Sequence, residues 1–199
     1  MKYILLLLLI ASLQGFSQEF NAGIFAGGVA SQLDGDTYAG YNKAGITAGG
    51  YINRNITKKL LWQFGLRYTQ KGSRYANSKL GVYYKAQLHY MDMPLTIRYR
   101  YFKKVDFEAG VSLGYLIKGF EQKGNNDIDE ANPPFNKFDL ASILGLNYHL
   151  NDKIDIGTFF SYSILTVRPY TSGNSDFMDD GQHNNIIYFI LSYKLSSWH

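Results

Sequence analysis

The chain has 199 residues, of which 46% are hydrophobic, with 17 tyrosines, 13 phenylalanines, 20 glycines, no cysteine and a formal net charge of +4. The length is that of one domain, and the lack of cysteine excludes disulfides, thiol nucleophiles and thiolate metal sites. The positive charge is weak and scattered, unlike the concentrated basic surface of a nucleic-acid-binding protein, so no nucleic-acid partner is expected.

Residues 1–17 have the layout of a secretory signal peptide. Lys2 precedes an apolar run over residues 4–10, and small residues follow at Gly15 and Ser17. Cleavage after Ser17 or Gln18 is expected, which leaves a single domain over residues 18–199 with 19 basic and 16 acidic residues. The apolar run is too short for a spanning helix, and no later window is apolar for about 18 residues. Any membrane residence must therefore use strands.

Eight strands are predicted along the mature chain, each long enough to cross a bilayer, for which about 9 to 11 tilted residues suffice. They lie at about residues 20–30, 43–53, 59–71, 86–101, 105–119, 137–150, 153–166 and 185–195. The first two are rich in glycine and alanine and alternate poorly. Small residues there favour a bend or close side-chain packing inside a narrow barrel.

The third and fifth strands show the clearest alternation of period two. Leu60, Trp62, Phe64, Leu66 and Tyr68 share one face of the third strand, and polar residues fill most of the other. The segment 105–117 repeats the split, with Val, Phe, Ala, Val, Leu, Tyr and Ile against Asp, Glu, Gly, Ser and Gly. Each strand therefore has one apolar and one polar face.

The connections between strands alternate in length. Segments 31–42, 72–85, 120–136 and 167–184 are long and rich in Gly, Asn, Asp and Pro, whereas 54–58, 102–104 and 151–152 are short. Long external loops and short periplasmic turns are typical of outer-membrane barrels, and an even strand count then places both termini in the periplasm. The sequence therefore predicts an all-β fold, an eight-stranded antiparallel up-and-down transmembrane barrel of the outer-membrane type. Its ends must pair, because an open sheet edge in hydrocarbon leaves backbone groups unsatisfied.

A soluble, lipocalin-like barrel has the same alternation with the faces reversed, so alternation alone does not decide between the two. The signal peptide, the long strands and the lack of disulfides favour the membrane. Mean hydropathy of −0.20 does not contradict this, since half of each spanning strand faces a polar interior.

The register assigns nine charged residues of both signs to the interior. An eight-stranded barrel is just wide enough for side chains to fill it, so a packed structural ion-pair network is expected. A narrow proton or ion path is the alternative. The nine are Arg67, Asp92, Arg98, Arg100, Asp106, Glu108, Lys118, Asp139 and Asp155.

The same register assigns thirteen aromatic residues to the lipid-facing side, several of them near strand ends, where aromatic girdles lie. They are Trp62, Phe64, Tyr68, Tyr99, Tyr101, Phe107, Tyr115, Phe138, Tyr148, Phe160, Tyr162, Phe189 and Tyr193.

No catalytic, cofactor or metal site is predicted. Ser112 or Ser161 with His149 and Asp155 supplies the residue types of a hydrolase triad, but their spacing does not support one. The acidic segment 125–130 offers oxygen ligands for calcium without the spacing of an EF-hand loop, so a solvated loop is expected. Asp176, Asp179 and Asp180 are interpreted in the same way.

Several segments resemble the PorT-like outer-membrane β-barrel family of Bacteroidota. They are YTQKG at residues 68–72, LHYMDMPLTIRY at 88–99, EAGVSLGYL at 108–116 and the closing YKL at 193–195. The resemblance implies an outer-membrane barrel. Its founding member is tied to type IX secretion, although a shared fold does not transfer an activity. Pro94 cannot donate to a strand ladder, so a bulge or bend is expected there.

The leading functional hypothesis is a non-enzymatic barrel that contacts outer-membrane lipid and serves a structural or partner-binding role, as an accessory subunit of an envelope secretion or assembly machine. The alternatives are a small-molecule or lipid-handling barrel, by binding or catalysis, and a narrow channel.

Overall fold

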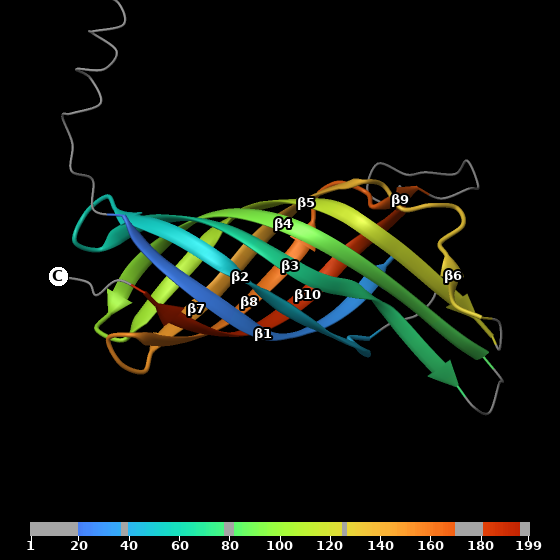
Figure 1. Cartoon of the computed structure of the whole chain (residues 1–199), viewed down its shortest axis with the longest axis horizontal. Coiled ribbons are helices and arrows are strands. Elements are labelled where there is room, and N and C mark those ends of the chain that lie inside the picture. The colour runs from blue at the N-terminus through green and yellow to red at the C-terminus, as the bar shows by residue number, and fades with distance from the viewer. Residues whose placement is uncertain (1–19, 37–39, 78–81, 125–126, 170–180, 196–199) are drawn as a thin grey trace, which may run out of the picture.

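The computed structural model describes residues 20–36, 40–77, 82–124, 127–169 and 181–195, which form a closed barrel (Figure 1). The predicted signal peptide lies outside these residues. No helix in the described part of the chain is long and apolar enough to cross a membrane. Eight long strands follow one another around the ring, each antiparallel to the next: β1 (Asn21–Asp34), β2 (Lys43–Asn55), β3 (Leu60–Asn77), β4 (Val82–Phe102), β5 (Val105–Lys123), β7 (Phe138–His149), β8 (Ile154–Ser163) and β10 (Gly181–Lys194).

Closure comes from the pairing of β1 with β10, in continuous register from Gly23↔Lys194 to Asp34↔His183. This pairing satisfies the backbone groups of both edge strands, as a barrel in hydrocarbon requires. Two short strands, β6 (Asp129–Glu130) and β9 (Arg168–Pro169), add to β5 and β10 within the loops. The predicted eight-stranded, antiparallel up-and-down fold is confirmed, and β6 and β9 were not predicted.

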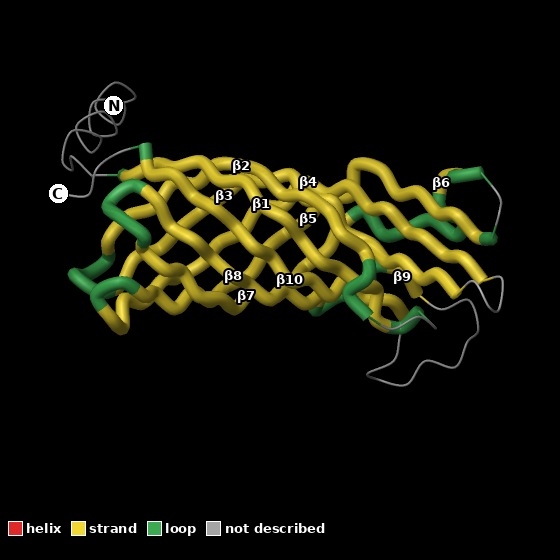
Figure 2. The backbone as a smooth tube through the Cα atoms, turned by 90° about the horizontal axis from the view of Figure 1, so that it is seen from below, coloured by secondary structure: helices red, strands yellow, loops and turns green. Residues whose placement is uncertain are grey.

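The barrel has a long-loop end and a short-turn end. The strands cross it at a tilt, and β3, β4 and β5 continue past their neighbours at the long-loop end (Figures 1 and 2). The predicted bounds of these three strands are therefore too short: residues 73–77 of β3 pair with residues 82–86 of β4 beyond the ring. We call this projecting sheet the extension. Its strands were predicted as loop because they have no continuous apolar face.

Side chains alternate around the ring as the sequence predicts. All thirteen predicted lipid-facing aromatic residues lie on the outer face, ten of them exposed and Trp62, Tyr68 and Tyr162 half-buried. Large aliphatic residues such as Leu66, Leu95 and Val111 share this face and are about half exposed. We call this outer surface the apolar band. The reversed, lipocalin-like arrangement is thus excluded.

Small residues on the inner wall make room for large side chains. Phe159 of β8 lies over Gly145 and Gly157, where an added Cβ would fall within 2.2 Å and 2.5 Å of its ring. Tyr51 lies over Gly23 of β1 in the same way. Gly23 of the first strand therefore accommodates close side-chain packing, one of the two roles expected for the small residues of the first two strands.

Pro94 interrupts a ladder without shifting its register. The pairing of β3 with β4 passes from Phe64↔Leu95 to Arg67↔Asp92, and the register is the same on both sides, while that of β4 against β5 is continuous through Pro94↔Ser112. The expected bulge at Pro94 is therefore wrong. The register of β4 against β5 shifts at two other places, near the short turn between Arg100 and Phe102 and, within the wall, between His89 and Tyr90, which face Lys118 and Leu116. Ile117 is the extra residue, and every side chain of β5 beyond it changes face.

Candidate functional site: the filled lumen and the long-loop mouth

Two layers of buried charge cross the lumen. The layer nearer the long loops, called the long-loop layer, holds Arg67, Lys71, Asp92 and Asp139, and all four are at most 5% exposed. The Lys71 Nζ lies 2.9 Å from Asp92 Oδ1 and 3.0 Å from Asp139 Oδ2. Two cations thus face two carboxylates, which is the balance that charges in a low dielectric require.

Aromatic rings and neutral polar groups complete the long-loop layer. The Arg67 guanidinium lies 4.3 Å from the ring centre of Tyr188, and Lys71 Nζ lies 4.3 Å from that of Tyr90. Thr69 donates a hydrogen bond to Asp92 at 2.8 Å, and Asn184 donates one to Asp139 at 2.9 Å. Cation–π contacts of this kind strengthen when they are desolvated.

The second layer, called the short-turn layer, holds Arg98, Arg100, Asp106, Glu108, His149, Asp155 and Lys194. The Arg98 Nε lies 2.6 Å from Glu108 Oε2, and Arg100 Nε lies 3.0 Å from Asp106 Oδ1. Lys194 Nζ lies 2.9 Å from Asp155 Oδ1. Three permanent cations therefore face three carboxylates, and the arginine of the outermost pair, Arg100, has a side chain that is 37% exposed.

His149 joins two carboxylates of the short-turn layer. Its Nε2 lies 2.9 Å from Asp106 Oδ2 and its Nδ1 lies 2.7 Å from Asp155 Oδ1. Because both ring nitrogens face carboxylates, neither is free to take a proton from a serine. The Oγ of Ser112 has no hydrogen-bond partner among the described residues. The residues considered for a hydrolase triad therefore do not form one.

An apolar cluster separates the two layers. It consists of Val29, Ile143, Phe159, Ile186, Tyr188 and Ile190, with Phe25 packed against it. A cavity of about 30 Å³ remains between this cluster and the arginines Arg67 and Arg98. That volume holds about one or two water molecules and does not form a continuous aqueous path.

The structure places eight of the nine predicted interior residues inside the barrel and one outside. Arg67, Asp92, Arg98, Arg100, Asp106, Glu108, Asp139 and Asp155 belong to the two layers. The placement of Lys118 was wrong: its side chain is exposed, because the bulge at Ile117 turns it outward. Lys71, His149 and Lys194 were not included in the predicted set, although the same alternation places each of them inward.

A polar cleft of about 500 Å³ opens at the long-loop end, between the extension and β9. Its walls include Asp36, Tyr83, Tyr84, Glu121, Lys123, Arg168 and Gln182. We call it the mouth cleft. Sequence reasoning did not find it, since its residues come from five separate segments with no common motif.

Arg168 ties the mouth cleft together. Its Nη2 lies 2.7 Å from Glu121 Oε1, its Nε donates to Gln182 at 2.9 Å, and its guanidinium lies 4.0 Å from the ring centre of Phe135. Burial alone would raise the pKa of Glu121, but hydrogen bonds from Arg168 and Tyr84 outweigh it and hold that pKa below its usual value of 4.5. Burial, together with the hydrogen bond to Glu121, raises the pKa of Tyr84. Glu121 is therefore an anion at neutral pH.

Underneath the mouth cleft, loop residues close the barrel. Phe135, Ala131 and Val167 from the long loops pack on Leu88, Tyr90 and Leu116 of the barrel wall. No group of three His, Asp or Glu within the described ranges is arranged to hold a metal ion. The described part of the acidic segment, from Asp127 to Glu130, is exposed, and Asp176, Asp179 and Asp180 lie outside the described residues.

A shallow groove of about 730 Å³ runs over the outer wall. Residues of β4, β5, β7, β8 and β10 line it, among them Ile97, Phe107, Leu144 and Phe160, together with the small residues Ala109 and Gly145. The lining is apolar and lies within the apolar band. Lipid acyl chains satisfy such a surface without a specific partner.

Comparisons with known proteins agree with this architecture. The attachment invasion locus protein Ail of Yersinia pestis superimposes with a TM-score of 0.53 at 16% identity, over 89% of this chain and 99% of Ail. Neisserial surface protein A superimposes with a TM-score of 0.54 at 11% identity, over 87% of this chain and 97% of that one. At these identities the likeness concerns the fold alone. No curated protein sequence matches significantly.

A family model described as "Outer membrane protein beta-barrel domain" matches residues 14–167, which is more than half of the chain. The match ends just before β9 and β10, and the structure shows that β10 completes the ring. The family match, the apolar outer band and the closed ring of eight strands together show that the chain belongs to the outer membrane protein beta-barrel domain family and is a protein of the outer membrane.

Proposed function

We propose that this protein is a non-enzymatic, non-conducting outer-membrane barrel that binds a partner at the cell surface through its extension and mouth cleft. The observation that carries the proposal is a contrast between the two parts of the molecule. The lumen is filled by charge layers that pair internally, whereas the long-loop end has a cleft of about 500 Å³ with charged walls. Recognition therefore belongs to the long-loop end.

The proposal includes an orientation. The connections at one end are short, such as Lys103 and Lys104 between β4 and β5, and both described chain ends lie there as well. Outer-membrane barrels place short turns in the periplasm and long loops outside. With this orientation the extension projects from the cell, and residues 20 and 195 are periplasmic.

The extension is well suited to a binding role because it is both rigid and elevated. Its strands stay paired up to Asn77↔Val82 and Tyr84↔Lys123, well beyond the point where β2 leaves β3. Binding surfaces on rigid elements lose less conformational entropy on association than flexible loops do. Ail, which shares the fold, is named as an attachment protein, and this supports a surface-binding role.

Within this proposal, we infer that the partner is a protein of an envelope secretion or assembly complex. The support is the resemblance to the PorT-like family carried by residues 68–72, 88–99 and 108–116. A small-molecule or lipid-handling barrel remains the second candidate, and the volume of the mouth cleft favours it.

Site-specific photo-crosslinking in cells tests the proposal. A crosslinking amino acid replaces Tyr83 in the mouth cleft, and the matched control carries it at Lys103 in an exposed short turn. We expect discrete protein adducts from position 83 and none of the same mass from position 103. A protein that stays a lone monomer at position 83, and that also purifies alone from native membranes, contradicts a partner-binding role.

A further inference from the structure

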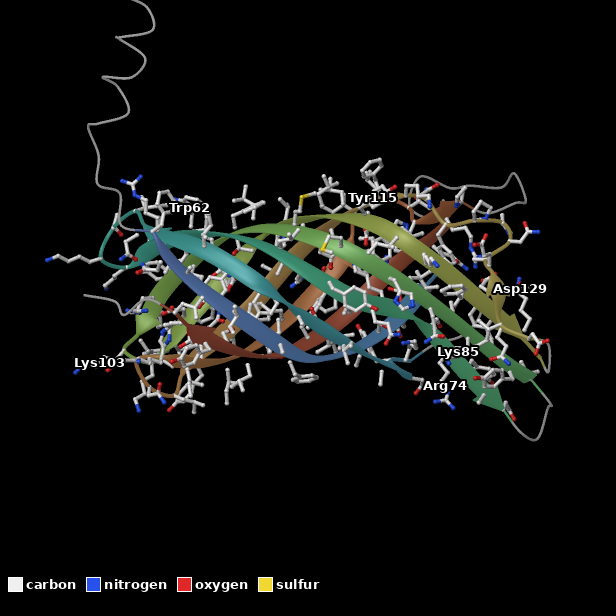
Figure 3. All side chains as sticks on the ribbon, viewed as in Figure 1. Trp62, Arg74, Lys85, Lys103, Tyr115 and Asp129 are labelled. Carbon is white, nitrogen blue, oxygen red and sulfur yellow. The ribbon has the colours of Figure 1, made fainter. Side chains whose placement is uncertain are left out.

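Three cations, Arg74, Lys85 and Lys118, lie at outward positions where the extension leaves the barrel, and a fourth, Lys43, is buried at the start of the neighbouring strand β2. Lys43 begins β2, Arg74 lies on β3, Lys85 on β4 and Lys118 on β5, so they occupy four neighbouring strands. Arg74 and Lys85 lie close together on the same side of the extension in Figure 3. We call Arg74, Lys85 and Lys118 the outer cationic cluster. Neither of the two charge layers in the lumen includes any of these cations.

The strand register explains how near these cations are to one another. Arg74 and Lys85 are direct cross-strand partners, and such pairs have Cβ atoms about 4.5–5.5 Å apart. Lys118 faces His89, four residues along β4 from Lys85, which is about 13 Å at the rise of a strand. The cluster therefore extends over a distance comparable to the width of a lipid headgroup.

The cations repel one another, and no carboxylate compensates them within the described structure. Lys43 experiences the positive charges of Lys85 and Arg74, and His89 experiences those of Lys43 and Lys118. Glu121 of β5, opposite Ala86, lies in the mouth cleft and pairs with Arg168. Glu130 of β6 is opposite Phe120 of β5 and makes no ion pair with any cluster member among the described residues. Like charges directly opposite each other on adjacent strands are destabilising unless an anion offsets them.

Lys43 provides a second, independent observation. Only 3% of it is exposed, yet among the described residues its Nζ donates only to the carbonyl of Ala44, at 2.8 Å, and forms no ion pair with a carboxylate. A buried ammonium with a single backbone acceptor keeps donors unused. Burial of a lysine without a counter-ion is costly, so Lys43 adds a further uncompensated positive charge beside the outer cationic cluster.

The position relative to the apolar band identifies the kind of anion. Tyr68, Met91 and Tyr115 form one outward row across β3, β4 and β5, and this row is apolar and aromatic. The next outward row toward the long loops is Gln70, His89 and Lys118, and two rows further lie Arg74 and Lys85. The change from aromatic to cationic side chains marks the level at which acyl chains end and headgroups begin.

We propose that the outer cationic cluster binds the phosphate groups of a phosphorylated glycolipid headgroup in the outer leaflet, with Arg74 and Lys85 as one contact and Lys118 as another. The acyl chains of such a lipid lie along the apolar band below Tyr115. The inference depends on the orientation proposed above only for the leaflet that supplies the lipid. The preference for phosphate follows from the cluster itself.

Native mass spectrometry of the mature protein in a non-ionic detergent tests this inference without reference to orientation. The probes are lipid A with two phosphates, lipid A with one, fully dephosphorylated lipid A and phosphatidylglycerol. We expect retention in that order for the three forms of lipid A, and weaker retention of phosphatidylglycerol than of the diphosphorylated form. Equal retention of the dephosphorylated and diphosphorylated forms, or of phosphatidylglycerol and diphosphorylated lipid A, overturns the proposal.

The variant R74Q/K85Q/K118Q is compared with K58Q/K103Q/K104Q, which removes the same charge from exposed short turns. Affinity for diphosphorylated lipid A is expected to fall at least tenfold in the first variant and to stay within twofold in the second. Heat-modifiable electrophoretic mobility confirms that each variant is folded, and the single variant R74Q, which lies beyond the barrel ring, is expected to lose threefold or more. An equal loss in both triple variants shows nonspecific charge attraction. Displacement of the lipid by equimolar inorganic phosphate shows that a free anion is the ligand, and either result contradicts the proposal.

Discussion

Lys71 and Asp92 face each other from neighbouring strands near the centre of the barrel, with 2.9 Å between Nζ and Oδ1 and side chains that are 3% and 0% exposed. The same ammonium lies 3.0 Å from Asp139, so one cation holds two carboxylates from β4 and β7. These two ion pairs therefore fix the positions of β3, β4 and β7 relative to one another. The interior is thus organised by charge pairing as much as by apolar packing.

Substitution of Lys71 by methionine is expected to destabilise the protein by about 3–5 kcal/mol, because two buried carboxylates lose their shared cation. Denaturant-induced unfolding in detergent micelles, followed by tryptophan fluorescence, measures the change. Lys58→Met in an exposed turn is the matched control and is expected to change stability by less than about 0.5 kcal/mol. A cost below about 1 kcal/mol for Lys71→Met shows that the long-loop layer does not depend on this ion pair.

Substitution of Val111 by arginine is expected to cost about 2–4 kcal/mol, because this outward side chain lies near the middle of the apolar band. The same arginine at Ala76, exposed on the extension, is expected to be nearly neutral. Folding equilibria in lipid vesicles compare the two. Equal costs at both positions are inconsistent with a bilayer around residues 107–117 of β5.

Phe159 fills the space above Gly145 and Gly157, so Phe159→Ala is expected to destabilise the barrel by about 3–5 kcal/mol. Both charge layers remain in this variant, so planar-bilayer recordings are expected to show no steady conductance for the native protein or for the variant. Stable single-channel steps from the native protein disprove the closed lumen.

The link between Glu121 and Arg168 is expected to weaken in acid. The pKa of Glu121 is lower in the folded protein than in the unfolded chain, so its contribution is complete above its usual value of 4.5 and is lost as the pH falls through the lower folded value. Hydrogen exchange of the Val167 amide, which donates to the Gln182 carbonyl at 2.8 Å, reports the state of this link. After correction for intrinsic exchange rates, protection is expected to drop below pH 4.5. In Glu121→Gln it is expected to be lower at neutral pH and insensitive to pH. Identical pH profiles for the two proteins contradict this role of Glu121.

The eight-stranded ring could be predicted from the sequence because the alternation of side chains along a strand is a local property. Arg67 and Asp92 occupy interior positions of strands whose opposite faces carry Phe64, Leu66 and Leu95, so their direction follows from the period of two alone. Lys118 was misplaced for the same reason. One extra residue at Ile117 reverses the parity, and nothing in the local sequence marks it.

The mouth cleft was beyond sequence reasoning because its residues are distant in the chain. Arg168 contacts Glu121, 47 residues away, and Tyr84, 84 residues away. Such loop contacts have no periodicity to predict them. The extension was not predicted as strand, because its polar outer face, with Arg74 and Lys85, has the composition of a loop. The sequence alone does not show where the barrel ends.

Spin labelling tests directly which face of each strand meets the lipid. The natural chain contains no cysteine, so single cysteines at positions 111, 112, 113, 114 and 115 of β5 are labelled without background. In lipid bilayers we expect the labels at 111, 113 and 115 to collide readily with dissolved oxygen and those at 112 and 114 to be shielded from it. Lipid contact at 112 and 114, or equal access of a water-soluble nickel reagent to all five positions, contradicts the placement of this barrel in a membrane.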